Sequence, residues 1–237
     1  MKELVLEVVS AAKSFEGRSV LHNASLWAYA GEVTVLLGRN GCGKTTLLRI
    51  ATGFLRPDSG TVRLHGEWIR RPRLHRLARH GLAYAPAYDF LPWDRPLGQL
   101  LELSAWPAVR ADAEARAREV AEELALTALL DQTTDELSGG ERRRAEIACA
   151  MLRRPACLVA DEPFRGIAPG DCERLTRVFR SAAAGGAAVV LTGHEITWML
   201  PVADRVIWCH HGTTDNLGTP QDAASHDLFR AQYLGPR

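Results

Sequence analysis

The chain has 237 residues, enough to bury a sizeable core as one large domain or as two small lobes. Charged residues make up 24% and the formal net charge is +1, so no overall field points to nucleic acid or to a membrane surface. The five cysteines form no CxxC pair, and reduced thiols are the simplest expectation. The opening MKELVLEVVS carries acids and lacks the apolar core of a signal peptide, and no run reaches the roughly 18 apolar residues of a membrane-spanning helix. Any membrane role is therefore expected to need a partner chain.

The first part of the chain predicts mostly β-strands. The runs LVLEVV (4–9) and VLHNASLWAYA (20–30) flank the turn-like EGR, and VTVLL (33–37) is short, apolar and β-branched, as a buried strand should be. TTLLRIATG predicts a helix over 45–53 that stops at Gly53. PDSG predicts a turn before a strand at 61–66. The basic RPRLHRLARHG predicts a short surface helix over 71–81, and LAYA predicts a strand at 82–85.

The middle of the chain changes to helical patterns. YDFLPWDRP (88–96) predicts a loop, and the segments 111–126 and 141–154 predict helices. After them, predicted strands at 156–160, 187–192 and 205–210 alternate with predicted helices at 171–184 and 196–200. This alternation favours an α/β fold with a parallel sheet, interrupted by an all-helical insert at about 89–154.

A phosphate-binding loop is predicted between the first buried strand and the first helix. GRNGCGKT (38–45) fits the pattern G-x-x-x-x-G-K-[ST] in that context. Such a loop curls backbone N–H groups around phosphate oxygens, and the helix N-terminus adds positive potential. Lys44 can reach the β- and γ-phosphates, and the Thr45 hydroxyl can ligate Mg²⁺. The alternative is a glycine-rich turn that binds nothing, and both flanking elements favour phosphate binding over it.

Two acids, Asp161 and Glu162, follow the apolar run CLVA. A carboxylate at the end of one buried parallel strand lies beside a phosphate loop at the end of another. We therefore expect Asp161 to hold Mg²⁺ through water and Glu162 to act as the general base on the attacking water. The alternative is a pair that closes a strand and caps the next helix, and the nearby phosphate loop favours catalysis.

Two further motifs lie at a helix start and at a strand end. In LSGGE (137–141), Ser138 and Glu141 fit a capping box, which alone is a sufficient structural explanation. The Gly139-Gly140 pair is unusual in a cap, and a bare helix mouth can bind an anion. LTGHE (191–195) ends a predicted strand and places His194 near the phosphate loop, although a lone strand-end histidine is usually structural.

These motifs, in this order, resemble those of the ATP-binding cassette, the nucleotide-binding subunit of ABC transporters. GRNGCGKT resembles the Walker A motif, LSGGE the family signature, CLVADE the Walker B strand with its catalytic glutamate, and His194 the switch histidine. The segments LSGGERRRAEIACAMLRRP, DEPFRGIAP and the YLG near the end are most similar to the lipopolysaccharide-export ATPases, with the branched-chain amino-acid importers next.

The resemblance implies an α/β fold: a P-loop NTPase (RecA-like) core with an antiparallel β subdomain and an inserted helical subdomain. Within one domain of 1–237, the RecA-like and β lobe would take about 1–88 and 155–237, and the helical signature lobe about 89–154. The implied cofactors are ATP and Mg²⁺, with the metal at Thr45 and Asp161 and catalysis at Glu162 and His194. The residues that would contact ATP are Phe15, which would stack on the adenine unless it is a core residue, and Gly38, Arg39, Asn40, Gly41, Cys42, Gly43, Lys44, Thr45 and Thr46.

The resemblance also implies partners. A second cassette, identical or different, would pack head to tail, so that Ser138, Gly139, Gly140 and Glu141 of one chain face the ATP of the other. The helical lobe would dock an integral membrane permease, which places the chain in the cytoplasm, peripheral on the inner face of the membrane. ATP hydrolysis would then power transport through that permease. The alternative is a soluble or regulatory cassette with weak or no hydrolysis, and no nucleic acid is expected as a partner.

Two positions depart from the family pattern. Ala87 stands where the family usually has a glutamine that senses Mg²⁺ and the attacking water. Ala168 stands where it usually has an aspartate that links the two active sites of a dimer. A methyl group can do neither, so the sequence predicts a slow ATPase, with Asp89 as a weak candidate substitute at the metal. Cys42 takes a small-residue position in the phosphate loop, and the helix N-terminus and Lys44 are expected to lower its thiol pKa.

Overall fold

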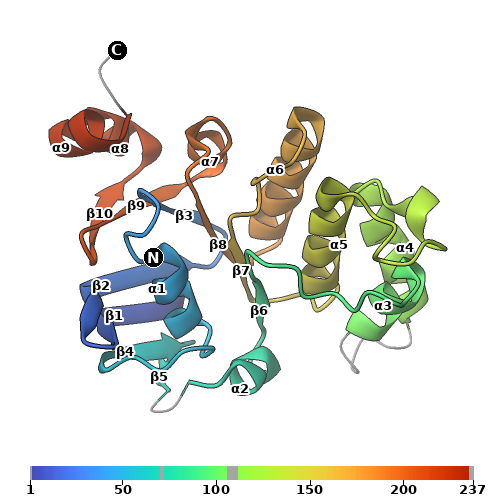
Figure 1. Cartoon of the computed structure of the whole chain (residues 1–237), viewed down its shortest axis with the longest axis horizontal. Helices are drawn as coiled ribbons and strands as arrows, with labels where there is room; N and C mark the ends of the chain where they lie inside the picture. The colour runs from blue at the N-terminus through green and yellow to red at the C-terminus, as the bar shows by residue number, and fades with distance from the viewer. Residues whose placement is uncertain (1, 70–71, 106–111, 235–237) are drawn as a thin grey trace.

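The computed structural model describes residues 2–69, 72–105 and 112–234, and its strands form one ten-stranded sheet (Figure 1). The strands follow the order β5-β4-β1-β2-β10-β9-β3-β8-β7-β6. The antiparallel part contains β1 (Leu4–Phe15), β2 (Arg18–Tyr29), β4 (Ser59–Leu64) and β5 (Glu67–Trp68). The parallel part contains β3 (Val33–Leu37), β6 (Leu82–Ala85), β7 (Cys157–Asp161), β8 (Ala188–Gly193) and β9 (Arg205–His210). The α/β class with an antiparallel strand region is confirmed.

Strand β10 (Thr213–Gly218) joins the two parts of the sheet. It pairs antiparallel with β9 and makes one parallel pair with β2, between Thr213 and Asn23. The sequence did not predict this strand, because its residues are mostly polar and only Leu217 among them is fully buried. Its pairing with β9 therefore comes from the tight turn before it and not from a hydrophobic pattern.

Helices cover both faces of the parallel part. The described part of the chain contains the helices α1 (Lys44–Ala51), α2 (Leu74–Arg79), α3 (Leu97–Ser104), α4 (Ala113–Glu123), α5 (Gly139–Met151), α6 (Pro169–Ala184), α7 (Ile196–Val202), α8 (Pro220–Ser225) and α9 (Asp227–Phe229). A 3₁₀ turn (Thr127–Leu129) follows α4, and a π turn (Arg230–Leu234) follows α9. The sequence predicted neither α3 nor the helices after β10. Three predicted positions lie outside the described residues: residue 71 of the basic helix, residue 111 of the helix predicted over 111–126, and residue 235 of the YLG segment.

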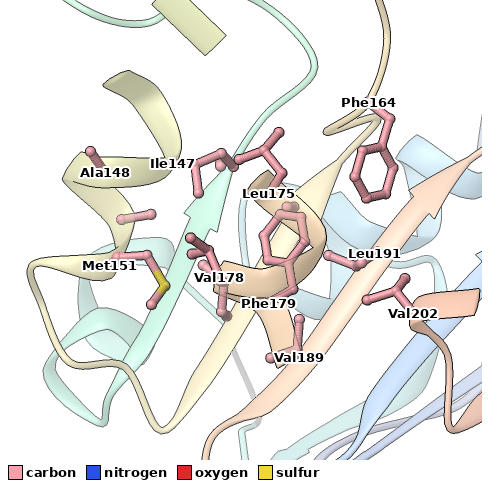
Figure 2. Close-up of a cluster of buried hydrophobic side chains, with 14 of the residues drawn as sticks. Ile147, Ala148, Met151, Phe164, Leu175, Val178, Phe179, Val189, Leu191 and Val202 are labelled. Carbon is pink, nitrogen blue, oxygen red and sulfur yellow. The ribbon is translucent and has the colours of Figure 1, made fainter. Parts of the chain in front are cut away.

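Alternation along the central strands gives each face of the sheet its own core. Val33, Val35 and Leu37 of β3 contribute to the core under α5, α6 and α7, and Leu36 contributes to the core under α1. Figure 2 shows part of the first core, where Val178 and Phe179 of α6 lie between α5 and β8. The two cores fix the ends of β3, β7 and β8, from which the candidate site is built.

The helices α3, α4 and α5 gather on one side of the molecule, away from the antiparallel strands (Figure 1). They fall within the predicted insert of 89–154, and the boundaries of that insert stay a prediction. Among the described helices, none combines the length and the apolar character that crossing a membrane requires.

Candidate functional site

The predicted phosphate loop connects the buried strand β3 to the first turn of α1. Gly43, the N-cap of α1, has φ +110°, and a Cβ there would stand 2.5 Å from the Leu21 side chain. Only glycine fits this position without strain. The buried Lys44 ammonium donates to the carbonyls of Gly38 (2.7 Å) and Arg39 (3.1 Å), so the loop is closed around its own lysine. The first turn of α1 contains no acid, which leaves its positive end uncompensated by a carboxylate.

Asp161 ends β7 with its carboxylate fully buried. One carboxylate oxygen accepts a short hydrogen bond from the Thr192 hydroxyl of β8, and the other has no hydrogen-bond partner among the described residues. A buried carboxylate oxygen without a partner is costly unless a cation or water satisfies it. The Asp161 carboxylate is thus a ready oxygen ligand for a hard cation.

Glu162 stands directly after Asp161 in a left-handed conformation, with φ +51°. Its backbone N–H is held by the Thr192 carbonyl (3.0 Å) and hydroxyl (3.1 Å), which fixes this uncommon turn. Its carboxylate lies between two cationic or potentially cationic groups, His194 Nδ1 at 3.8 Å and Arg165 Nη1 at 3.4 Å. The structure therefore brings Glu162 and His194 together, and it adds Arg165, which sequence reasoning missed.

Ser138 begins α5 with a complete capping box. Its hydroxyl accepts from the Glu141 N–H (3.4 Å), and its own N–H donates to the Glu141 carboxylate (2.8 Å). The Ser138 hydroxyl, which also donates to the Glu141 carboxylate (2.6 Å), and then the Ser138 N–H lower the pKa of Glu141. The capping box does not explain the two glycines that follow, Gly139 and Gly140. Among the described residues, a Cβ on Gly139 would meet no atom within 4 Å, and one on Gly140 would meet only an Asp171 oxygen at 3.9 Å. Packing within the chain does not require either glycine.

Phe15 ends β1 with its side chain in contact with solvent, 44% exposed. The Lys13 ammonium lies 5.6 Å from the centre of its ring. The alternative that Phe15 is a core residue is therefore wrong, and the role of its ring in stacking on adenine stays a prediction.

The two alanines that depart from the family pattern are both exposed. Ala87 follows β6 in a loop, and Ala168 is the N-cap of α6, where it offers no side-chain cap. Asp89, the candidate substitute at the metal, instead pairs with Arg142 of α5 at 3.0 Å. In this structure the Asp89 carboxylate is thus held by the helix α5.

Arg143 of α5 is the main residue at this site that sequence reasoning missed. Its buried guanidinium donates to the carbonyls of Pro86 (2.6 Å) and Asp161 (2.6 Å) and to the Glu146 carboxylate (2.7 Å). Pro86 directly precedes Ala87. The Arg143 side chain therefore connects α5 both to the loop after β6 and to the end of β7. The run of three arginines after Glu141 was the available signal, but a charged run ordinarily predicts a solvent-exposed face.

The chain matches the family model described as ABC transporter over residues 21–165, more than half of its length. The lipopolysaccharide export system ATP-binding protein LptB of Acidithiobacillus ferridurans is 36% identical over 237 residues, which is 99% of this chain and 98% of that protein. LptB of Escherichia coli K12 is 33% identical, over 97% of each chain. The solved structure of an ATP-binding subunit of an ABC transporter superposes with a TM-score of 0.84 at 26% identity, covering 97% of this chain and 96% of the other. The predicted family resemblance is confirmed, and this chain belongs to the ABC transporter family as one of its ATP-binding subunits.

Proposed function

We propose that this chain binds Mg²⁺-ATP, hydrolyses it, and thereby powers transport through separate membrane permease subunits. One observation carries the proposal: the phosphate loop after β3, the acids after β7 and His194 after β8 leave the same edge of one parallel sheet. In open α/β sheets, ligands bind at the carboxyl ends of the strands. The similarity to LptB proteins over nearly the whole chain supports the assignment to a transport ATPase.

The phosphates would lie against the backbone N–H groups of the loop 38–46, with Lys44 beside the β- and γ-phosphates. The Thr45 hydroxyl and the free carboxylate oxygen of Asp161 are the oxygen donors suited to Mg²⁺. When bound, the metal would neutralise charge on the phosphates. The exposed ring of Phe15 would stack on the adenine.

Glu162 would serve as the general base. It would take a proton from the attacking water as the water's oxygen bonds to the γ-phosphorus and the bond to ADP breaks, so that ADP and inorganic phosphate leave. His194, within 3.8 Å of that carboxylate, would orient it toward the water. The Arg165 guanidinium lies against the other carboxylate oxygen and must move aside, or share it, when the base acts. Together with the two alanines, this contact supports a low basal rate.

A second cassette would complete the site. The N-terminus of α5 carries two glycines that packing within the chain does not require. This supports binding of a ligand from outside the chain, namely the γ-phosphate of ATP held by a partner's loop. Ser138 and the glycine N–H groups would contact it in trans. Both a homodimer and a heterodimer satisfy this arrangement.

An apolar pocket of about 290 Å³ is a suitable surface for the permease. It lies between the loop after β6 and helices α2 and α5, and its rim carries the exposed rings of Phe54, Tyr88 and Phe90. The Arg49 guanidinium lies 5.8 Å from the Phe54 ring and 5.9 Å from the Tyr88 ring, which orders the aromatic rim. An apolar helical segment of a permease fits this chemistry. The chain would then sit in the cytoplasm at the inner face of the membrane.

The test is phosphate release and ATP binding by the purified chain. Wild type should bind ATP in a Mg²⁺-dependent manner and release phosphate slowly. Lys44→Ala should weaken ATP binding, because the lysine charge faces the β- and γ-phosphates. Glu173→Gln, an exposed carboxylate of α6 outside the site, is the matched control and should leave both properties unchanged. Unaltered ATP affinity in Lys44→Ala would contradict the phosphate-loop assignment.

A pull-down from detergent-solubilised membranes tests the permease. Phe90→Asp should lose a co-purifying membrane protein that wild type retains, because a buried charge opposes apolar docking. Retention of the same protein by the variant would contradict this docking surface. Absence of any membrane partner for wild type would favour a soluble cassette.

A further inference from the structure

Two thiols lie together at the base of the phosphate loop. Cys42 is part of the loop, and Cys209 is in β9, the strand beside β3. The Cys209 thiol donates to the Cys42 carbonyl at 3.2 Å. A Cβ on Gly38 would lie 2.7 Å from the Cys42 sulfur and 2.2 Å from the Cys209 carbonyl. Because Gly38 has no side chain, the Cys42 sulfur can lie close to the backbone of Cys209.

This pair has access to solvent through a cavity of about 810 Å³. Both cysteines line it, together with the cationic side chains of Arg18 and Arg39. Cys42 is only partly buried, whereas Cys209 is fully buried behind it. A small oxidant can therefore reach Cys42 first, and the nearby cations favour its thiolate.

In a redox pair, the thiol that attacks the oxidant needs a low pKa, and the pKa values of these two thiols differ in this way. A side-chain hydrogen bond between the two thiols, and then the charge of Lys44, lower the pKa of Cys42 to about 6. The same thiol–thiol interaction, and then burial, raise the pKa of Cys209. At neutral pH, Cys42 is the thiolate nucleophile and Cys209 keeps its proton.

We propose that Cys42 and Cys209 form a two-thiol redox site that a peroxide converts to a disulfide, and that this disulfide prevents the phosphate loop from binding nucleotide. The Cys42 thiolate attacks one peroxide oxygen, the O–O bond breaks, a sulfenic acid forms, and the leaving hydroxide takes up a proton to become water. The Cys209 sulfur then attacks the Cys42 sulfur, the S–O bond breaks, and the Cys209 proton leaves with the hydroxyl as a second water. Two thiols lose two electrons and two protons, and one peroxide becomes two waters.

The loop can move enough for the bond to form. Cys42 stands between Gly41 (φ +79°) and Gly43 (φ +110°), and glycine backbones adjust at low cost. A disulfide would draw Cys42 toward β9 and fix it there, which displaces the N–H groups on either side of it. Bound nucleotide would hold the same loop in its open form. This second half of the proposal rests on the proposed nucleotide site.

Hydrogen peroxide, peptide mapping and a fluorescent ATP analogue test the proposal together. Peroxide-treated wild type should yield one linked peptide joining Cys42 to Cys209, and ATP present during treatment should suppress it. The oxidised protein should bind the analogue at least about tenfold more weakly, and a thiol reductant should restore binding. Cys209→Ala should yield no linked peptide and should accumulate a sulfenic acid at Cys42 that dimedone traps.

Cys149→Ala, which removes a buried thiol of α5, is the matched control and should form the linked peptide as wild type does. If Cys209→Ala does not fold, Cys209→Ser keeps the polar contact and serves in its place. Oxidised wild type without the linked peptide would overturn the proposal, as would a linked protein with unchanged nucleotide affinity. Reduced wild type that binds no nucleotide would instead count against the proposed function, while the linked peptide still reports on the thiol pair.

Discussion

Replacing Arg143 with methionine should destabilise the subunit far more than most single changes. The side chain is 10% exposed, and its ion-pair partner Glu146 is 2% exposed. Arg143→Met leaves that carboxylate buried without its cation and leaves the Pro86 and Asp161 carbonyls without their donor. Removing one partner of a buried ion pair costs about 3–5 kcal/mol. For a chain of this size, the melting temperature should fall by on the order of 10 °C.

The loss of folding stability in Arg143→Met should depend on pH. Burial raises the pKa of Glu146, and Arg143 opposes that shift, so the pKa rises further in the variant. The pKa of Glu146 in the folded variant then lies above its pKa in the unfolded chain. Burying this carboxylate therefore costs no folding stability below the unfolded pKa and costs most above the folded pKa. The deficit of Arg143→Met should therefore be largest near neutral pH and should shrink toward about pH 4.

Equilibrium unfolding in urea, followed by circular dichroism at pH 7 and at pH 5, measures both effects. Arg118→Met removes an exposed helical ion pair with Glu114 and should cost no more than about 1 kcal/mol. The double variant Arg143→Met/Glu146→Leu removes both buried charges and should be more stable than Arg143→Met alone. A single variant within about 1 kcal/mol of wild type would refute the buried-pair reasoning. So would a double variant no more stable than the single one.

Three further changes test the chemistry of the site. Glu162→Gln should keep ATP bound and stop phosphate release, since the amide cannot take a proton from water, and light scattering should show a trapped dimer rather than a monomer. Ala87→Gln and Ala168→Asp together should raise steady-state phosphate release, because a misplaced attacking water can cost on the order of 10²-fold; a double variant no faster than wild type would contradict this. Cys42 should be alkylated faster than the other thiols, with a rate that rises through about pH 6 and levels above pH 7, and ATP should protect it; equal labelling with and without ATP would oppose this.

Features that depend on a few neighbouring residues could be predicted from the sequence. The glycine-rich loop between a buried strand and a helix is one, and the capping box at Ser138 is another, because both follow from local backbone chemistry. Contacts between distant segments could be predicted only where strand ends meet, as for Glu162 and His194. Cys42 and Cys209 are 167 residues apart, and only the pairing of β9 with β3 brings them together. Arg143 was missed because helical patterning assigns charge to solvent, whereas here three carbonyl and carboxylate acceptors make burial of the guanidinium favourable.

The position of β3 has a consequence for the order in which the chain can assemble during synthesis. Its hydrogen-bonded neighbours are β8 and β9, and β8 begins roughly 150 residues after β3 ends. At about 5–20 residues per second, a ribosome needs about 10–30 s to supply them. The adjacent strands β1 and β2 can pair at once, but β3 keeps both edges unpaired throughout that interval. The candidate site is thus completed only after β8 and β9 have been made, long after the loop that follows β3.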